Sequence, residues 1–328
     1  MRLLLAALVV CASSAVAQDR PSFDCSKAST KVERTICGNA ELAKADRELA
    51  AAYAQLAAKL SGAAKDHLAS DQARWTANRN RGCTGAGDDI EDCLKIRYGT
   101  RSEQLAFLAA GDYPFVSEQA LIRTGKVKRI DYRIDAAYPQ FDAKSADFAQ
   151  VNRSLAEWTE KAARQAIPVA TKVDDDAEQE WSYEQNFQLY RPNRRAVSLA
   201  FSYRTYTGGA HGYLATDCFL VDLRTASLAG LDEIFAPGEQ WLKRLVELVR
   251  NDLKEQFVDR PGNDALIEPD NMTEMLKQGH RYLFRDDNTL EVIFNPYEVG
   301  PYAAGPYSVE ISYDDLRSMF RPDGPLGE

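Results

Sequence analysis

Histidine and closely spaced metal-ligand pairs are scarce in this chain of 328 residues. Its three histidines form no H-x-H or H-x-x-x-H pair, and its six cysteines form no C-x-x-C pair. Zinc sites usually need such spacings. No serine stands in a G-x-S-x-G nucleophile elbow, so the commonest hydrolase motif is missing as well. The sequence therefore predicts no metal site, no cofactor and no enzyme activity.

Long apolar runs are absent beyond the N-terminus. A single basic residue precedes an apolar run over residues 3–11, and an A-x-A site ends at Ala17. This pattern is typical of a secretory signal peptide, and the run is too short to cross a bilayer. Cys11 raises a lipoprotein alternative, but Val10 stands where a small residue is normally required. We expect residues 1–17 to be cleaved off and the protein to be periplasmic or secreted, without stable membrane insertion.

The chain has no excess of basic residues. Residues 18–110 hold 14 Lys/Arg and 13 Asp/Glu, whereas residues 111–328 hold 25 and 36. An acidic surface disfavours nucleic acid and anionic lipid as partners. It favours encounter with a basic protein, although the same charge also serves solubility. A mature chain of about 310 residues exceeds the usual size of one domain, so we expect two.

The first part of the chain has the apolar spacing of helices. Residues 41–60, 63–79 and 88–108 carry apolar side chains three, four and seven positions apart. Glycines separate these segments and end the helices. This part therefore predicts an all-helical hairpin or bundle.

Four cysteines lie within this helical part. In an exported segment they indicate two disulfides, for which three pairings are possible. If the first two helices are antiparallel, the start of one lies near the end of the other. We therefore expect Cys37–Cys83 and Cys25–Cys93. Cys218 stands apart in an alternating apolar segment and is expected to be a buried free thiol.

The cysteine spacing and the residues between resemble a known family. The pattern "DCSKASTKVERTICGNAELAKADRELAAAYAQL…QARWTANRNRGC…CLKIRYGTRSEQL" is similar to LprI-type domains, named for a mycobacterial lipoprotein that inhibits lysozyme. The resemblance implies a secreted or envelope helical domain over residues 22–110 and points to lysozyme inhibition. We expect Trp75 in its core, and Arg79 and Arg101 paired with Glu33 or Asp46. The matching positions are Cys25, Glu33, Ile36, Cys37, Leu42, Asp46, Tyr53, Gln72, Trp75, Arg79, Cys83, Cys93, Arg101 and Leu105.

The second part mixes strand and helix patterns. Alternating segments joined by hairpin-like connections indicate a mainly antiparallel sheet, and two helical segments accompany them. We expect an α+β domain over residues 120–322 with two helices. Pro139 is expected to stop the first strand. The predicted strands include residues 130–138, 181–190, 196–206 and 213–223, and the helices are residues 151–167 and a long one after Pro237.

One predicted hairpin has an unusual tip, "TYTGGAHGY". Glycine supplies positive φ in a tight turn, yet a simple hairpin needs only about two loop residues. In a catalytic hypothesis, His211 is a general base. It then needs a partner such as Asp217 or Tyr206, and the site also needs a nucleophile. A docking reading uses the glycines to bring backbone amides close to a partner. The sequence leaves these readings open.

Two segments of the second part resemble another family. "SYRTYTGGAHGYLATDCFLVDLRTASLAGLDEIF" and "LEVIFNPYEVGPYAAGPYSVEISYDDL" are similar to the lysozyme-binding extracellular domain of RsiV-type anti-sigma factors, a module also found in some peptidoglycan deacetylases. The carried positions are Gly208, Gly209, Ala210, His211, Asp222, Leu231, Phe235, Phe294, Tyr297, Pro301, Tyr302, Ala303, Gly305 and Pro306. The resemblance implies a lysozyme-type peptidoglycan hydrolase as the protein partner.

We expect the two glycine-rich loops to lie together and to block the cleft of such a hydrolase. Tyrosine provides large contact area at low entropy cost, as binding hot spots do. Two alternatives stay open: a non-inhibitory module that binds peptidoglycan or another envelope component or acts as a sensor, and a hydrolase that uses His211. The predicted partner-binding residues are Tyr206, Thr207, Gly208, Gly209, His211, Tyr297, Pro301, Tyr302, Gly305 and Pro306.

Overall fold

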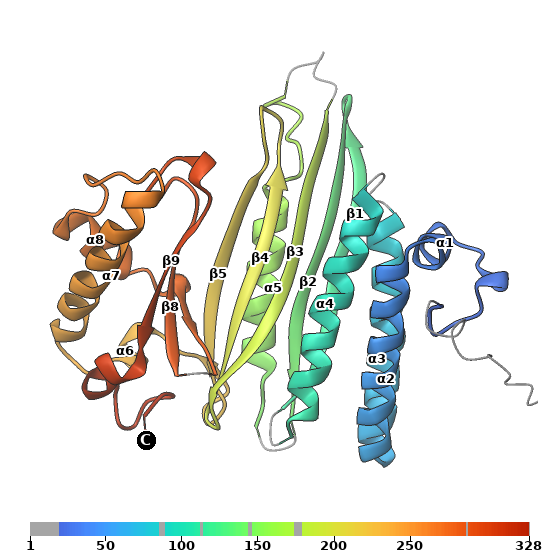
Figure 1. The fold of residues 1–328 in the computed structure, drawn as a ribbon, viewed down its shortest axis with the longest axis horizontal. Helices are drawn as coiled ribbons and strands as arrows, with labels where there is room; N and C mark the ends of the chain where they lie inside the picture. Colours follow the sequence, from blue (N-terminus) through green and yellow to red (C-terminus); the bar gives the residue numbers. More distant parts are fainter. Residues whose placement is uncertain are drawn as a thin grey trace, which may run out of the picture.

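A group of helices, a long sheet and a smaller sheet follow one another along the chain. They also lie side by side in space in that order (Figure 1). The computed structural model describes residues 20–84, 89–111, 114–143, 146–173, 179–286 and 288–327. The predicted signal peptide lies outside the described residues. Helices in the described ranges lack an apolar stretch of the length and hydropathy needed to span a membrane.

The first part is helical, as predicted. A 3-10 turn, η1 (Cys25–Lys27), leads into α1 (Lys31–Gly38), α2 (Ala40–Lys59), α3 (Gly62–Thr84) and α4 (Ile90–Ala109). Separate N-caps on Thr30 and Asn39 start α1 and α2, so the chain forms a short extra helix that its apolar spacing did not predict. Trp75 is buried in the core, and Arg79 pairs with Asp46 at 3.9 Å, as expected.

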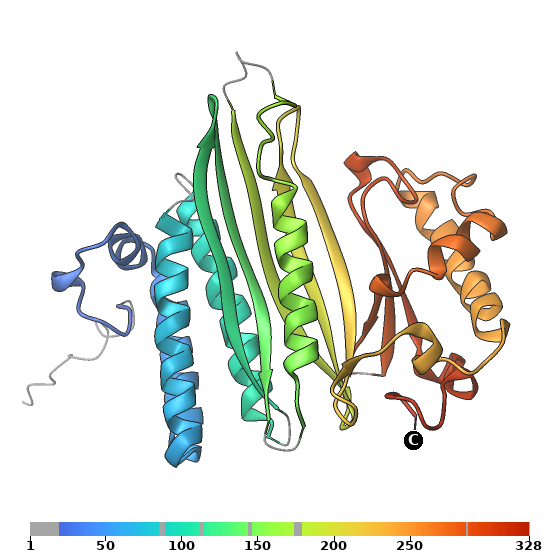
Figure 2. The same ribbon diagram turned by 180° about the vertical axis from the view of Figure 1, so that it is seen from behind.

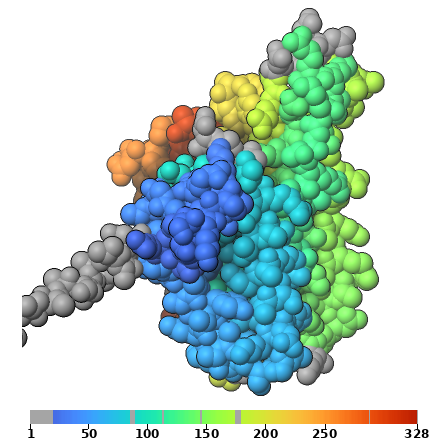
Figure 3. Space-filling model, turned by 90° about the vertical axis from the view of Figure 1, so that its right-hand side faces the viewer, coloured from blue at the N-terminus to red at the C-terminus, as the bar shows by residue number. Residues whose placement is uncertain are grey.

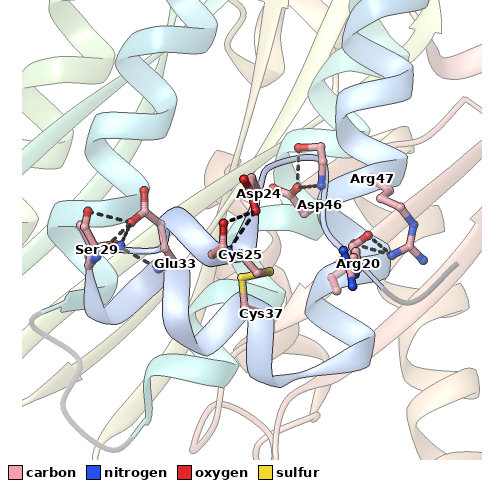
Figure 4. Close-up of a disulfide and its surroundings, with 12 residues drawn as sticks. Arg20, Asp24, Cys25, Ser29, Glu33, Cys37, Asp46 and Arg47 are labelled. Atoms are coloured by element: carbon pink, nitrogen blue, oxygen red, sulfur yellow. Dashed lines mark hydrogen bonds between the residues drawn. A yellow bond between two sulfur atoms is a disulfide. The ribbon is translucent and has the colours of Figure 1, made fainter. Parts of the chain in front are cut away.

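The predicted disulfide pairing Cys37–Cys83 and Cys25–Cys93 is wrong. The structure pairs Cys25 with Cys37 and Cys83 with Cys93. The reason is local: α1 turns its C-terminal end back toward the segment that carries Cys25 (Figure 4). Likewise, Cys83 lies in the last turn of α3 and Cys93 in the first turn of α4, and their Cα atoms are 5.5 Å apart. Each disulfide therefore joins segments that follow one another in the chain, with sequence separations of 12 and 10, rather than distant ones.

The long sheet has six strands in the order β1-β2-β3-β4-β5-β6, and the parallel pair is β2 with β3. The crossover between these two strands contains α5 (Ala149–Arg164). Helices α4 and α5 lie on opposite faces of the sheet (Figures 1 and 2). The mixed, mainly antiparallel α+β class is thereby confirmed. The strands are β1 (Phe115–Val127), β2 (Ile130–Asp142), β3 (Glu180–Asn193), β4 (Ala196–Tyr206), β5 (Tyr213–Asp222) and β6 (Ser227–Leu228).

Pro139 does not stop its strand, contrary to prediction. It lies within β2, opposite Glu118 of β1. Pairing of β2 with β3 runs only from Asp131 to Ala136, so Pro139 lies beyond that ladder. A proline is tolerated in a strand where its missing N–H faces away from a partner.

The last part packs helices on a second, antiparallel sheet with the order β7-β8-β9. Helix α7 is the long helix predicted after Pro237, whereas α6 and α8 were not anticipated. The helices are α6 (Leu231–Ile234), α7 (Gln240–Asp259) and α8 (Pro269–Leu276), with 3-10 turns η3 (Gly279–Arg281), η4 (Tyr302–Ala304), η5 (Tyr313–Asp315) and η6 (Arg317–Met319). The strands are β7 (Tyr282–Phe284), β8 (Thr289–Phe294) and β9 (Tyr307–Ser312). Cys218 of β5 is buried and free.

A buried ionic network joins the helices to the long sheet. Arg101 of α4 pairs with Asp71 of α3 at 2.6 Å, and the backbone N–H of Glu118 in β1 donates to the same carboxylate. Arg97 contacts both Glu118 and Asp135 of β2. Burial raises the pKa of Glu118, and the charge of Arg97 opposes that rise. The predicted pairing of Arg101 with Glu33 or Asp46 is therefore wrong, because its guanidinium binds Asp71 and Gln72 of α3.

We call this network the junction; it consists of Asp71, Arg97, Arg101, Glu118 and Asp135. The helices and the sheet pack closely beside it. A side chain at Gly82 of α3 would overlap the Asp135 carboxylate, so glycine at this position leaves room for that buried carboxylate where the helix meets β2. In the space-filling view, the blue and cyan atoms of the helical part lie directly against the green atoms of the residues that follow (Figure 3). The helices and the long sheet thus form one packed body.

Candidate partner-binding surface

The two loops predicted to dock a partner lie together. One joins β4 to β5 and the other joins β8 to β9, so they come from different sheets. The Tyr302 hydroxyl donates to the Gly212 carbonyl at 2.5 Å, and the rings of His211 and Tyr302 stack with centroids 3.8 Å apart. We call residues 206–212 and 297–306 the two-loop surface.

The first loop depends on its glycines. Gly208 and Gly209 have φ of 91° and 98°, in the left-handed region that favours glycine. The Tyr206 hydroxyl donates to the Gly209 carbonyl at 3.0 Å and closes the loop. Thr207 is exposed beside them. The loop is thus held in one shape by its own backbone contacts.

His211 is held by both loops. Its Nδ1 lies 2.9 Å from the Gly212 carbonyl, which can only accept, so Nδ1 carries the proton. That tautomer leaves Nε2 to accept from the Tyr297 hydroxyl, 3.4 Å away. The side chain therefore has a structural role within the surface, whatever else it contributes.

The second loop is a rigid turn with aromatic side chains. Pro301 precedes η4, and Gly305 ends it with φ of 74°. The Arg260 guanidinium donates to the carbonyl of Pro306 at 2.8 Å and to that of Ala304. Tyr297 projects with 57% of its surface exposed. The loop thus presents an exposed tyrosine ahead of a turn whose backbone is held by Arg260.

Sequence reasoning missed one member of this region. Leu214, the second residue of β5, is 52% exposed beside the first loop. Strand alternation gives the reason: Tyr213 and Ala215 turn to the face that α5 covers, so Leu214 turns outward. An apolar residue at an outward strand position next to a glycine-rich loop was the available indication.

The structure does not assemble the catalytic partners considered for His211. Asp217 lies near His280, with 3.8 Å between carboxylate oxygen and Nε2. Burial raises the pKa of Asp217, and His280 opposes the rise. Tyr206 is engaged with Gly209. Within the described ranges, His, Cys, Asp and Glu form no group of three or more that would hold a metal ion.

Comparison with known families divides the chain into three matched segments. Residues 24–106 match the family described as Lysozyme inhibitor LprI, residues 127–213 match Deacetylase PdaC, and residues 232–314 match a family described as Protein of unknown function (DUF3298). The LprI resemblance of the N-terminal helices is thereby confirmed. The two-loop surface combines a loop that ends the second segment with a loop inside the third.

Individual relatives are distant and only partly covered. Peptidoglycan-N-acetylmuramic acid deacetylase PdaC of Bacillus subtilis is 24% identical over 214 residues, which are 64% of this chain and 42% of that protein. Lipoprotein LprI of Mycobacterium tuberculosis is 30% identical over 127 residues, 38% of this chain and 59% of that protein. The chain thus spans less than two thirds of either relative. A DUF3298 family protein from Pseudomonas aeruginosa PAO1 aligns with a TM-score of 0.45 at 16% identity, over 66% of this chain and 99% of that chain.

Proposed function

We propose that the protein is a periplasmic or secreted envelope protein that binds and inhibits a lysozyme-type peptidoglycan hydrolase. The match of residues 24–106 to Lysozyme inhibitor LprI supports this class. The signal-peptide pattern that ends at Ala17 supports export. In this proposal the protein acts by occlusion and performs no catalysis, and domains 22–110 and 120–322 cooperate as one body.

The observation that carries the proposed site is the meeting of two loops in one exposed aromatic surface. Tyr297 and Tyr302 have ring centroids 5.5 Å apart, and His211 stacks on the second ring. Tyrosines in rigid loops are typical anchors of protein interfaces. The acidic last part, residues 229–328, holds 20 Asp/Glu and 10 Lys/Arg and favours encounter with a basic enzyme.

The contacts on each tyrosine distinguish their roles. The Tyr302 hydroxyl is used inside the protein, so this residue offers its ring. The Tyr297 hydroxyl donates to His211 Nε2 over a long distance of 3.4 Å, a weak contact that a stronger acceptor on a partner can replace. Glycosidase clefts hold a pair of carboxylates that flank the sugar bond. A projecting phenol is a suitable donor to such a carboxylate.

The test is titration of the oxidised protein into hen-type lysozyme, with complex formation and cell-wall lysis both measured. We expect a complex and a loss of lysis. The double substitution His211→Ala and Tyr302→Ala should weaken binding more than tenfold without unfolding the protein. Ile96→Ala, an exposed apolar residue on α4, is the matched control and should bind as the native protein does. Unchanged affinity in the double variant would refute the proposed site.

A second candidate is non-inhibitory binding to peptidoglycan or to another envelope protein. The similarity to a peptidoglycan deacetylase over 214 residues favours it. Sedimentation with purified peptidoglycan distinguishes the two. Binding to peptidoglycan with undiminished lysozyme activity would support this candidate against the inhibitor.

A further inference from the structure

Tyr297 has a backbone conformation that is unfavourable for an aromatic residue. Its φ is 76°, a region that bulky residues rarely occupy. Such a conformation persists only where the surrounding structure fixes it, and it is often associated with function. The side chain does not explain it, because the ring is largely exposed. The cause must lie in the contacts on either side of the residue.

One set of contacts fixes the residue that follows. The Glu298 carboxylate accepts from the backbone N–H of Asn295 at 2.8 Å and from the Arg281 guanidinium at 3.1 Å. Arg281 is 3% exposed and also donates to the carbonyls of Ile293 and Met275. The carboxylate therefore folds the loop around Tyr297 and attaches it to β8 and to the end of α8.

Another contact fixes the residue before the turn. The Asn295 side-chain amide donates to the Thr216 carbonyl at 3.2 Å and accepts from the Thr216 N–H at 2.8 Å. This side chain pairs with β5 as a neighbouring strand would. Because β5 begins at the end of the first loop, Asn295 sets the distance between the two loops.

We propose that Arg281, Glu298 and Asn295 form a positioning cluster that holds Tyr297 as a preorganised anchor of the two-loop surface. This inference rests on the proposed function for its partner, a protein with a concave site that receives one projecting phenol ring. A preorganised side chain loses little freedom on binding, so more of the contact energy appears as affinity. The cluster acts through Tyr297 and does not itself touch the partner.

The first test needs no partner. Hydrogen exchange is measured for the backbone amides of residues 297–300 and 209–212 in Asn295→Ala and in Glu298→Gln. We expect exchange to rise about tenfold in both segments. The matched control is Glu291→Gln, which removes a carboxylate paired with Arg285 at 3.2 Å in the same small sheet. Equal exchange in the cluster variants and the control would overturn the positioning role.

The second test measures affinity for hen-type lysozyme. We expect Asn295→Ala and Glu298→Gln to weaken binding about tenfold, mainly through faster dissociation, and the control to bind as the native protein does. Raised exchange with unchanged affinity would overturn the anchor role of Tyr297. If the native protein does not bind, the proposed function fails, while the exchange experiment still decides whether the cluster positions the loop.

Discussion

Two regions of the molecule use polar side chains in opposite ways. At the junction, Asp71, Arg97, Arg101 and Glu118 are buried, and their charges face one another. On the two-loop surface, the hydroxyls of Tyr206 and Tyr302 donate to backbone carbonyls, and the rings stay near the solvent. In the junction the charged groups therefore pair with one another and specify how two layers pack. In the two-loop surface they shape the loops and leave the rings exposed to the partner proposed above.

This contrast predicts which property each region controls. Removing one member of a buried ion pair leaves the other charged and unpaired, which lowers stability strongly. Removing a ring from an exposed loop costs little stability but removes contact area. Substitutions at the junction should therefore change the free energy of unfolding, and those at the surface should change affinity.

The largest effect is expected for Arg101→Met. It removes the 2.6 Å partner of the fully buried Asp71, which keeps its partly exposed partner Arg74 at 3.2 Å, so the free energy of unfolding should fall by about 3 kcal/mol, the lower end for a buried pair. Urea denaturation measures the change. The matched control is Arg123→Met, which removes an exposed pair with Glu160 and should cost less than about 1 kcal/mol. Equal losses of unfolding free energy in the two variants would contradict a stabilising role of the junction.

The next effect concerns the disulfides. Replacing Cys83 and Cys93 by alanine opens a loop with a sequence separation of 10, which should lower the free energy of unfolding by about 3 kcal/mol. Opening the Cys25–Cys37 loop, with a separation of 12, should cost a similar amount. Mass spectrometry of unreduced peptides checks the pairing itself. Recovery of a Cys37–Cys83 peptide would contradict the structure.

A smaller effect is expected from Tyr302→Phe. The substitution keeps the ring stacked on His211 but removes the hydrogen bond to the Gly212 carbonyl, a loss of about 1 kcal/mol. Affinity for the lysozyme-type partner should fall only a few fold, compared with more than tenfold for the double alanine variant. Isothermal titration calorimetry gives the comparison. A loss of affinity as large as that of the double alanine variant would show that the hydroxyl, rather than the ring, contributes most to binding.

The smallest effect is expected in acid, at the cap of α1. Hydrogen bonds from the N–H groups of Thr30 and Ser29 lower the pKa of Glu33 from 4.5 to about 2. Because the pKa is depressed in the folded state, the cap stabilises α1 fully above pH 4.5 and is lost as the pH falls toward about 2. Carboxyl chemical shifts in NMR measure this pKa. A value near 4.5 would contradict the capping box.

Local sequence patterns predicted the helices and strands better than they predicted which of them contact one another. Apolar spacing indicated α2, α3, α4 and α7, and alternation indicated β3, β4 and β5, because both signals depend on nearby residues. The meeting of the two loops followed from a resemblance rather than from spacing. The stack of His211 on Tyr302 joins positions far apart in the chain, and no local pattern reports such contacts.

The wrong predictions concern residues whose contacts depend on how distant segments of the chain pack together. Arg101 faces Asp71 because α3 and α4 pack on the sheet, and nothing near Arg101 in the sequence reports that layer. Cys37 pairs locally because Thr30 and Asn39 cap two separate helices where one was expected. Pro139 is tolerated because β3 ends its pairing earlier, which depends on strand register. In each case tertiary packing decided among choices that the sequence left open.

Competition at the cleft tests the central claim most directly. The oxidised protein is titrated into hen-type lysozyme with and without a saturating chito-oligosaccharide that fills the cleft. If the two-loop surface enters the cleft, the sugar should weaken binding strongly, and the His211→Ala, Tyr302→Ala variant should bind weakly in either condition. An affinity that is unchanged by the sugar would contradict occlusion of the cleft.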